Sequence, residues 1–375
     1  DGRFDWLPVA PAAAPGSRGK VLLGTSGTTG VPKAMSIDGD TLWSSGRAFM
    51  DFHALVASGA RFWNYLPVSY LGGLFNLGLI PLAAEGSILV DEAFSGRTFL
   101  NYWTNAQRAG VDTLWLVPTL LRGLLAMVRG APERSREMAR SVRRAFLGTA
   151  PIELAEKRRF EDAFGMSPLE NFALSETTFL TSEVASQLDL RSEGSVGAAL
   201  PYVDIRLRPV TAADSDVEGV ASQELVVRTP FLFEGYLDAD GSLSRPDHEG
   251  GFPTGDLGYR NARGQFVITG RTKDIVKKGG YLIALWEIEH LVRRMAGVRE
   301  CAAIGIKHDF YGESYVIHIV PDGADGAAIR RDVLREIHRT LAKFRWPEEV
   351  VLAAEIPKTA SGKVRKAALA SRSER

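Results

Sequence analysis

The sequence has a single cysteine, no net charge and few histidines. With Cys301 alone among 375 residues, no internal disulfide can form, and we expect a reducing, cytoplasmic environment. Lys and Arg together number 45, as do Asp and Glu, so nothing in the charge balance indicates a nucleic-acid partner. The six histidines are scattered along the chain, which argues against a zinc site.

The sequence also has no long uninterrupted hydrophobic run. Its most apolar stretch, residues 66–90, is broken by Pro67, Pro81 and Glu85, whereas a membrane span needs about 20 apolar residues in succession. The first ten residues lack the basic start and apolar block of a signal peptide. We therefore expect a globular protein that does not associate with a membrane.

What the sequence does contain is a regular alternation of β-rich runs and helical patterns. The expected strands cover residues 20–24, 61–66, 87–90, 113–117 and 144–148. The expected helices cover residues 41–57, 73–84, 98–109 and 119–128. Alternating strands and helices predict an α/β domain with a mostly parallel sheet and helices on its faces.

The later part of the chain changes in character twice. Strand-like residues 204–208, 224–228 and 265–269, separated by glycine-rich turns, predict a small β-subdomain. From residue 274 onward two helical patterns flank two strands, 301–306 and 315–320. Their apolar faces are formed by Ile288, Leu291, Val292 and Met295, and by Ile329, Val333, Leu334, Ile337 and Leu341. We expect a large domain over residues 1–272 and a mobile α+β domain over residues 273–375.

A loop rich in glycine and hydroxyl residues follows the first expected strand. It comprises Thr25, Ser26, Gly27, Thr28, Thr29, Gly30, Val31, Pro32 and Lys33. Its glycines let the backbone approach a ligand closely, and its hydroxyls and amides can donate to phosphate oxygens. Many surface loops have such a composition, and no Gly-Lys-Ser/Thr closes this one as in a Walker-type P-loop. The chemistry predicts phosphate binding but does not indicate a kinase or GTPase.

Seven further segments follow this loop: Gly148-Thr149-Ala150-Pro151, Asn171-Phe172-Ala173-Leu174-Ser175-Glu176-Thr177, Gly194-Ser195-Val196-Gly197, Phe233-Glu234-Gly235-Tyr236, Thr254-Gly255-Asp256, Gly270-Arg271-Thr272-Lys273-Asp274 and Pro357-Lys358-Thr359-Ala360-Ser361-Gly362-Lys363. The loop and these segments, in this order, resemble the motifs of the adenylate-forming superfamily. That superfamily comprises acyl- and aryl-CoA ligases, adenylation domains of peptide synthetases, and luciferase. The resemblance implies ATP-dependent activation of a carboxylic acid as an acyl-adenylate, with release of pyrophosphate.

The same resemblance implies roles for individual residues. The loop, with Thr28, would hold the ATP phosphates. Adenine would lie between Gly148, Thr149, Ala150 and Pro151 and the segment Asn171, Phe172, Ala173, Leu174 and Ser175, stacked on the Phe172 ring. Glu176 would hold Mg²⁺ beside the phosphates, since a hard cation prefers oxygen ligands. Asp256 would accept the ribose hydroxyls, and Arg271 would reach ribose or the α-phosphate.

Lys363 is the residue expected to carry catalysis. A carboxylate must attack the α-phosphate, so two anions meet and the transition state gathers further negative charge. A cation that reaches both groups positions them and stabilises that charge. Without the resemblance, Lys363 would be one lysine in a solvated basic tail.

The acid and the acceptor are less defined. The pocket candidates Tyr70, Gly73 and Phe75 favour an aryl or medium acyl acid over an amino acid. Tyr70 stands where many acyl- and aryl-ligases have histidine. Lys273 matches the hinge of the family's rotating C-terminal domain, and Gly279, Gly280 and Tyr281 would line a tunnel for the thiol of coenzyme A or of a carrier protein's phosphopantetheine.

Three alternatives stay open at this stage. A nucleotide-binding pseudoenzyme or scaffold of the same fold is one, a non-thiol acceptor is a second, and another ATP-using enzyme such as a kinase is a third. Family members carry a much longer region ahead of the phosphate loop than the 24 residues present here. If a natural short form lacks covering elements, a homodimer could cover the exposed surface.

Overall fold

The computed structural model describes residues 19–25, 33–68, 71–92, 96–128, 132–209, 216–217, 220–221, 223–238, 240–245, 250–323, 325–358, 364–366 and 368–369. The chain forms two compact units. The first runs to Asp204 and includes residues 227–252 and 261–267. The second comprises residues 205–226, 253–260 and 268–375. Because the second unit takes in part of the β-subdomain, it is larger than the expected C-terminal domain. The boundary of a moving domain at 272/273 stays a prediction.

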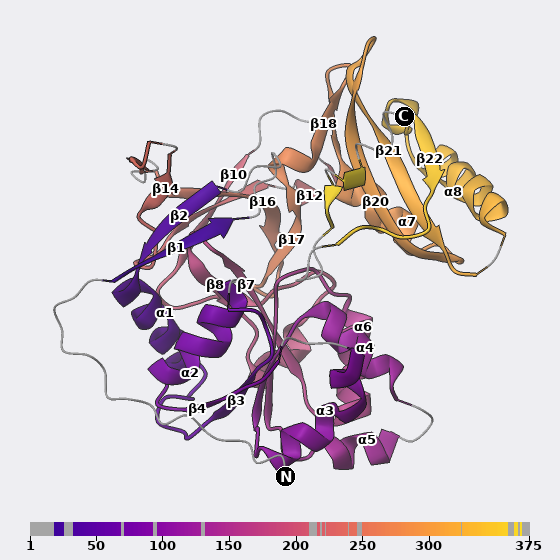
Figure 1. The fold of residues 1–375 in the computed structure, drawn as a ribbon. Coiled ribbons are helices and arrows are strands. Elements are labelled where there is room, and N and C mark those ends of the chain that lie inside the picture. Colours follow the sequence, from indigo (N-terminus) through magenta and orange to yellow (C-terminus); the bar gives the residue numbers. More distant parts are fainter. Residues whose placement is uncertain are drawn as a thin grey trace. The chain divides into compact units, whose positions relative to one another are not determined.

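A seven-stranded sheet forms the centre of the first unit (Figure 1). Its order is β4 (Ser87–Val90), β3 (Arg61–Asn64), β5 (Thr113–Leu116), β6 (Arg144–Leu147), β7 (Pro168–Leu174), β8 (Thr178–Ser182) and β9 (Ala198–Ala199). The strands from β4 to β7 are parallel, as the alternation of strands and helices predicts, and β8 and β9 join antiparallel. The carboxyl ends of β3, β5, β6 and β7 therefore meet at one edge.

Helices cover this sheet on both sides, with α1 and α2 on one and α3 to α6 on the other (Figure 1). The helical elements of this unit are α1 (Gly39–Phe52), the π-helix η1 (Gly72–Leu79), α2 (Ile80–Ala83), α3 (Gly96–Arg108), α4 (Pro118–Ala126), α5 (Pro132–Ala139), α6 (Leu154–Phe164) and the 3₁₀-helix η2 (Ala185–Leu190). Aromatic rings fill the space beneath α1, where Phe49 stacks on Phe179 with ring centroids 4.0 Å apart. Such rings bury large apolar areas, and this packing fixes α1 against the sheet.

A second sheet in the first unit brings together distant parts of the chain. It contains β1 (Lys20–Thr25), β2 (Lys33–Asp38), β14 (Gly235–Leu237) and β15 (Leu243–Ser244), all antiparallel. The β1–β2 hairpin was not predicted beyond its first strand, because β2 follows a loop whose sequence gives no turn signal of fixed length. The hairpin places the two ends of the predicted phosphate loop side by side.

The second unit contains most of each β-subdomain strand, and it also contains an α+β part. The former are β10 (Asp204–Pro209), β13 (Gln223–Arg228), β16 (Phe252–Arg260) and β17 (Phe266–Arg271) in one sheet, with the hairpin β11 (Asp216–Val217) and β12 (Val220–Ala221). The latter comprises β18 (Ile275–Lys278), β19 (Tyr281–Ala284), β20 (Val298–His308), β21 (Gly312–Pro321) and β22 (Glu349–Leu352), with η3 (Thr272–Asp274), α7 (Leu285–Arg293), α8 (Gly326–Thr340) and η4 (Lys343–Arg345).

The two apolar helix faces predicted for this unit form its core. Ile288 and Val292 of α7 are buried with Ile329, Val333 and Ile337 of α8. Cys301 lies in the same cluster, and burial raises the pKa of its thiol to about 11. A buried thiol that stays protonated at neutral pH is a poor nucleophile, so Cys301 is a core residue. In the part of the chain that the structure describes, no helix is long and apolar enough to cross a membrane.

Candidate active site

The carboxyl edge of the parallel sheet gathers two of the predicted nucleotide segments. Gly148 follows β6 directly, and its N–H donates to the Leu116 carbonyl at the end of β5 (3.3 Å). The Asn171 side chain on β7 donates to the Leu147 carbonyl at 2.9 Å. A Cβ on Gly148 would lie 3.0 Å from the Asn171 side-chain oxygen, so only glycine fits without displacing Asn171. Ligands of open α/β sheets bind outside such carboxyl ends.

Thr149 stands out within this turn. Its φ is 81°, a conformation that a β-branched residue seldom adopts. Its hydroxyl oxygen is buried and has no hydrogen-bond partner among the described residues. Strain of this kind gathers at functional sites, and Thr149 thus shows both a strained backbone and a polar atom that a bound ligand could satisfy. Ala150 is half-buried and Pro151 is exposed at the mouth of the turn.

The hairpin formed by β7 and β8 carries the second segment. Phe172 is half-buried, Ala173 is exposed, and Leu174 and Ser175 are half-buried towards the turn. The register shifts by one residue after Phe172, a β-bulge that changes the direction of the side chains beyond it. The hairpin therefore presents a partly accessible aromatic ring before its turn and Glu176 within the turn.

Glu176 is tied to the sheet that carries the phosphate loop. The Tyr236 hydroxyl on β14 donates to the Glu176 carboxylate at 2.8 Å, and the Phe233 N–H donates to the Glu176 carbonyl at 2.8 Å. Burial, and then the Glu176 charge, raise the pKa of Tyr236 above its usual value, so its hydroxyl remains a donor. Because β14 pairs with β2, these bonds connect the metal-site candidate to the strand on which the loop ends.

The phosphate loop itself lies mostly outside the described residues. Thr25 ends β1 opposite Lys33 at the start of β2. Next to this pair of strands, Glu234 accepts from Lys20 at 2.8 Å and from the Ser36 hydroxyl at 2.7 Å. Phosphate binding by this loop therefore remains a prediction. This holds for Ser26, Gly27, Thr28, Thr29 and Gly30, and for the side chains of Thr25 and Lys33.

The predicted acid pocket is only partly described. Tyr70 lies outside the described residues. Gly73 is the second residue of the π-helix η1, and a Cβ there would come within 2.3 Å of the Pro67 carbonyl oxygen. Phe75 is 2% exposed and its ring stacks on Phe179, so it belongs to the core beneath η1. An α-helix was expected over 73–84. The observed π-helical turns are typical of functional sites, and no sequence pattern predicts them.

In the second unit, Asp256 and Arg271 form an ion pair. The Arg271 Nε lies 2.8 Å from an Asp256 carboxylate oxygen, and Asp256 is 3% exposed. Both belong to the β-subdomain sheet, on β16 and β17. Asp256 follows Gly255, whose φ is 71° and whose N–H donates to Glu224 at 3.2 Å. The structure thus brings together the two residues that the resemblance assigns to the ribose and α-phosphate.

The predicted hinge and thiol-tunnel residues come shortly after Arg271 in the sequence. Lys273 lies in the 3₁₀-helix η3, and burial and the neighbouring Arg271 lower its pKa. Gly279 and Gly280, with φ of 57° and 92°, form the two-residue turn between β18 and β19, which requires positive φ at both positions. Tyr281 is 47% exposed beside this turn and stacks on Phe344, with ring centroids 4.2 Å apart.

Lys363 lies outside the described residues, but its flanks are anchored. Lys358 pairs with Val364 in an antiparallel bridge, and the Arg365 N–H donates to the Pro357 carbonyl at 2.8 Å. Lys366 lies 3.2 Å from Asp274, the residue after the hinge candidate. The catalytic role of Lys363 stays a prediction.

Comparisons with known proteins agree with this arrangement of motifs. The family model for AMP-binding enzymes matches residues 9–237, and the model for the AMP-binding enzyme C-terminal domain matches residues 287–363. The chain belongs to the AMP-binding enzyme family. The α/β fold, with a large N-terminal part and a C-terminal part, matches solved structures of adenylate-forming enzymes.

Several proteins that are similar in sequence to this chain are named as CoA ligases. A sulfoacetate–CoA ligase of Cupriavidus necator is 31% identical over 96% of this chain and 66% of its own length. An oxalate–CoA ligase of Arabidopsis thaliana is 28% identical over 93% of this chain and 65% of its own. ATP-bound MatB from Rhodopseudomonas palustris is 30% identical with a TM-score of 0.77, over 94% of this chain and 67% of that one. The chain spans about two thirds of the length of these relatives.

Two features of the site were missed from the sequence. The Tyr236 hydroxyl bond to Glu176 joins residues 60 positions apart, and only the resemblance of residues 233–236 to a family segment marked that region. The strain at Thr149 depends on backbone angles that its sequence does not reveal.

Proposed function

We propose that the protein uses ATP to convert a carboxylic acid into an acyl-adenylate, releases pyrophosphate, and passes the acyl group to a thiol. The observation that carries this proposal is the β7–β8 hairpin of a chain that belongs to the AMP-binding enzyme family. At the carboxyl edge of the sheet it offers the Phe172 ring for the adenine. In its turn it offers Glu176, bonded to Tyr236 of the sheet that flanks the phosphate loop.

The residues around Glu176 fit a magnesium ion. Mg²⁺ dehydrates reluctantly and is commonly held by one or two carboxylates together with substrate phosphates and water. Among the described residues there is no cluster of three potential ligand side chains, and Glu176 is a single, half-exposed carboxylate. That donor set suits an ion held largely by ATP, which would offset phosphate charge. Glu176 would orient that ion, while the Tyr236 hydroxyl holds the carboxylate in place.

Asp256, Arg271 and Lys363 would bind the ribose and stabilise the negative charge of the reacting groups. Asp256, in its ion pair with Arg271, offers carboxylate oxygens to ribose hydroxyls, and the guanidinium adds positive charge on the phosphate side. Lys363 would stabilise the charge that builds up as the carboxylate oxygen bonds to the α-phosphorus and the bond to pyrophosphate breaks. Replacing Lys363 with Ala should lower the rate of adenylate formation about a hundredfold or more while ATP affinity changes little.

A thiol acceptor is supported by the surface beside the Gly279–Gly280 turn. Tyr281 and Phe344 form an exposed stacked pair, and Phe310 is 83% exposed on the hairpin whose Tyr311 carbonyl accepts from the Gly279 N–H at 3.0 Å. Exposed aromatic faces suit the planar adenine of coenzyme A. A phosphopantetheine-bearing carrier protein is the alternative thiol donor, and an amine is a third acceptor class.

For the acid, we propose an aryl or medium acyl group because the candidate pocket residues are apolar or aromatic, with Gly73 on η1 and Phe75 packed in the core beneath it. A small acid with a second anionic group is the other candidate, since relatives are named for sulfoacetate and oxalate. A panel of both classes, assayed with and without coenzyme A, decides between them. No AMP with any acid would favour the scaffold alternative, and ADP as product would indicate a kinase.

A further inference from the structure

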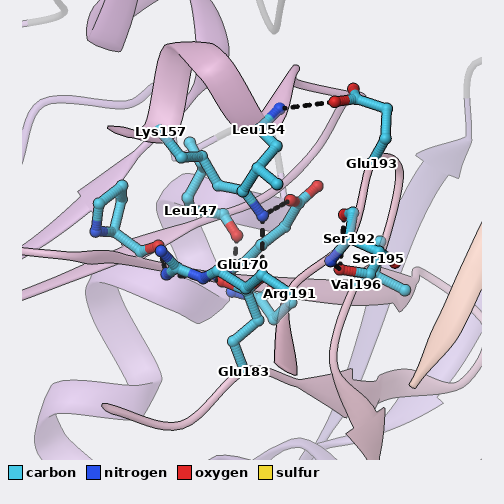
Figure 2. A network of polar contacts seen from close by, with 12 residues as sticks. Leu147, Leu154, Lys157, Glu170, Glu183, Arg191, Ser192, Glu193, Ser195 and Val196 are labelled. Atoms are coloured by element: carbon cyan, nitrogen blue, oxygen red, sulfur yellow. Dashed lines mark hydrogen bonds and ion pairs between the residues drawn. The ribbon is translucent and has the colours of Figure 1, made fainter. Parts of the chain in front are cut away.

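A buried cluster of charged side chains lies at the base of the hairpin that carries Glu176 (Figure 2). Lys157 of α6 is 1% exposed, and its ammonium lies 2.7 Å from Glu170 on β7 and 2.8 Å from Glu183 just after β8. Arg191 lies 2.9 Å from Glu183 and also pairs with Glu161 of α6. Four of these ionisable groups, Lys157, Glu170, Glu183 and Arg191, are buried, and their desolvation is costly, so stability alone is a weak explanation for the cluster.

The bonds of this cluster define how the two strands begin to pair. Glu183 donates its N–H to the Glu170 carbonyl at 2.8 Å, while the Glu170 N–H donates to the Glu183 carboxylate at 2.9 Å. Arg191 donates to the Pro168 carbonyl at the start of β7 (2.7 Å). Backbone and side-chain bonds thus close the hairpin at one end, and Lys157 bridges the two carboxylates that face each other there.

The register set at the base reaches the other end of the hairpin. From Glu170 and Glu183 the strands pair through Phe172 and Thr181, pass the β-bulge and end at Leu174 opposite Thr178. Thr178 has a φ of 56°, so the turn that holds Glu176 is strained and depends on its surroundings. A shift of one residue would reverse the faces on which the side chains of this hairpin lie.

We propose that Lys157 is a positioning residue for nucleotide binding: by bridging Glu170 and Glu183 it fixes the β7–β8 register that places Phe172 and Glu176. This inference rests on the proposed function. It adds a buried residue on α6 that belongs to none of the sequence motifs.

The test replaces Lys157 with Met, which removes the ammonium while keeping much of the volume. The Kd for Mg·ATP, measured by isothermal titration calorimetry, and the KM for ATP should both rise about tenfold or more, whereas the KM for the acid should change less than about threefold. Adding Glu170→Gln to this variant should restore ATP affinity to within about threefold of wild type. The substitution replaces the Glu170 carboxylate, which Lys157→Met leaves unpaired, with an amide that can donate to Glu183.

Glu156→Gln is the matched control. Glu156 neighbours Lys157 on α6 and forms an ion pair with Arg122 of α4 at 2.7 Å, away from the hairpin. The Glu156→Gln substitution should lower thermal stability without changing ATP affinity. If the Lys157→Met variant does not fold, Glu183→Gln carries the test, with the same selective loss of ATP affinity expected.

Unchanged ATP affinity in the folded Lys157→Met or Glu183→Gln variant would overturn the inference. So would equal losses of affinity for ATP and for the acid, or a loss of ATP affinity in Glu156→Gln as large as that in Lys157→Met. Calorimetry measures ATP binding without any activation of an acid, so its result does not depend on the proposed function. A wild-type chain that binds ATP but activates no acid would contradict the function and leave the inference testable.

Discussion

Removing the Tyr236 hydroxyl should weaken nucleotide binding through Glu176. Tyr236→Phe deletes one oxygen and leaves the ring, which packs edge-on against Phe233 with centroids 4.8 Å apart. The lost bond is 2.8 Å long and has a carboxylate acceptor, and bonds to charged groups contribute about 1.5–3 kcal/mol. Because both side chains are partly exposed, we take the lower limit, which corresponds to about a tenfold higher KM for Mg·ATP.

The assay is ATP–pyrophosphate exchange at saturating acid, with ATP and Mg²⁺ varied together. Tyr202→Phe is the control, since Tyr202 also packs edge-on against a phenylalanine, Phe231, but its hydroxyl has no hydrogen-bond partner among the described residues. The raised pKa of Tyr236 keeps its hydroxyl protonated, so the effect should be constant from pH 6 to 9. Equal KM values for the two variants would refute the role given to this bond.

Three further predictions address the edge of the sheet, the buried cluster and the hinge. Gly148→Ala should lower the free energy of unfolding by about 1–3 kcal/mol, seen in thermal denaturation, because the new Cβ meets Asn171 at 3.0 Å; an unchanged Tm would contradict the close packing. Burial raises the pKa of Glu170 from 4.5 to about 7, against the opposing effect of Lys157. The folded chain then retains a proton that the unfolded chain releases, and stability should fall by up to about 1.4 kcal/mol per pH unit as pH rises from 4.5 to 7. Urea denaturation should show this contribution in wild type and not in Glu170→Gln, and identical pH profiles would exclude it. Lys273→Pro should spare adenylate formation to within about twofold and slow thioester formation about tenfold or more; equal losses in both half-reactions would rule out a hinge at this position.

The alternation of strands and helices and the apolar faces of the C-terminal helices could be predicted from the sequence. Strand β4 matches its predicted range, and the apolar residues predicted on α7 and α8 are buried in or packed against the core. These successes rest on hydrophobic periodicity, which reports local burial. The β1–β2 hairpin and its pairing with β14 were not predicted, because strands about 200 residues apart in sequence leave no local signal.

For the site, the motifs located Gly148, Asn171, Glu176, Asp256 and Arg271, and the structure groups the first three in one unit and the ion-paired last two in the other. The contacts that hold them could not be predicted. Lys157 belongs to none of the predicted elements or motifs, yet it is buried between two carboxylates. Its burial depends on strands that fold against α6, and a single helix pattern carries no information about them.

Whether this chain forms acyl-adenylates is tested most directly by the nucleotide product made from ATP and Mg²⁺ across the acid panel, with coenzyme A present to accept the acyl group and release AMP. We expect AMP and pyrophosphate in equal amounts with at least one carboxylic acid, and loss of both products in Lys363→Ala. ADP as the product, or AMP formation that is the same in Lys363→Ala as in wild type, would contradict this expectation.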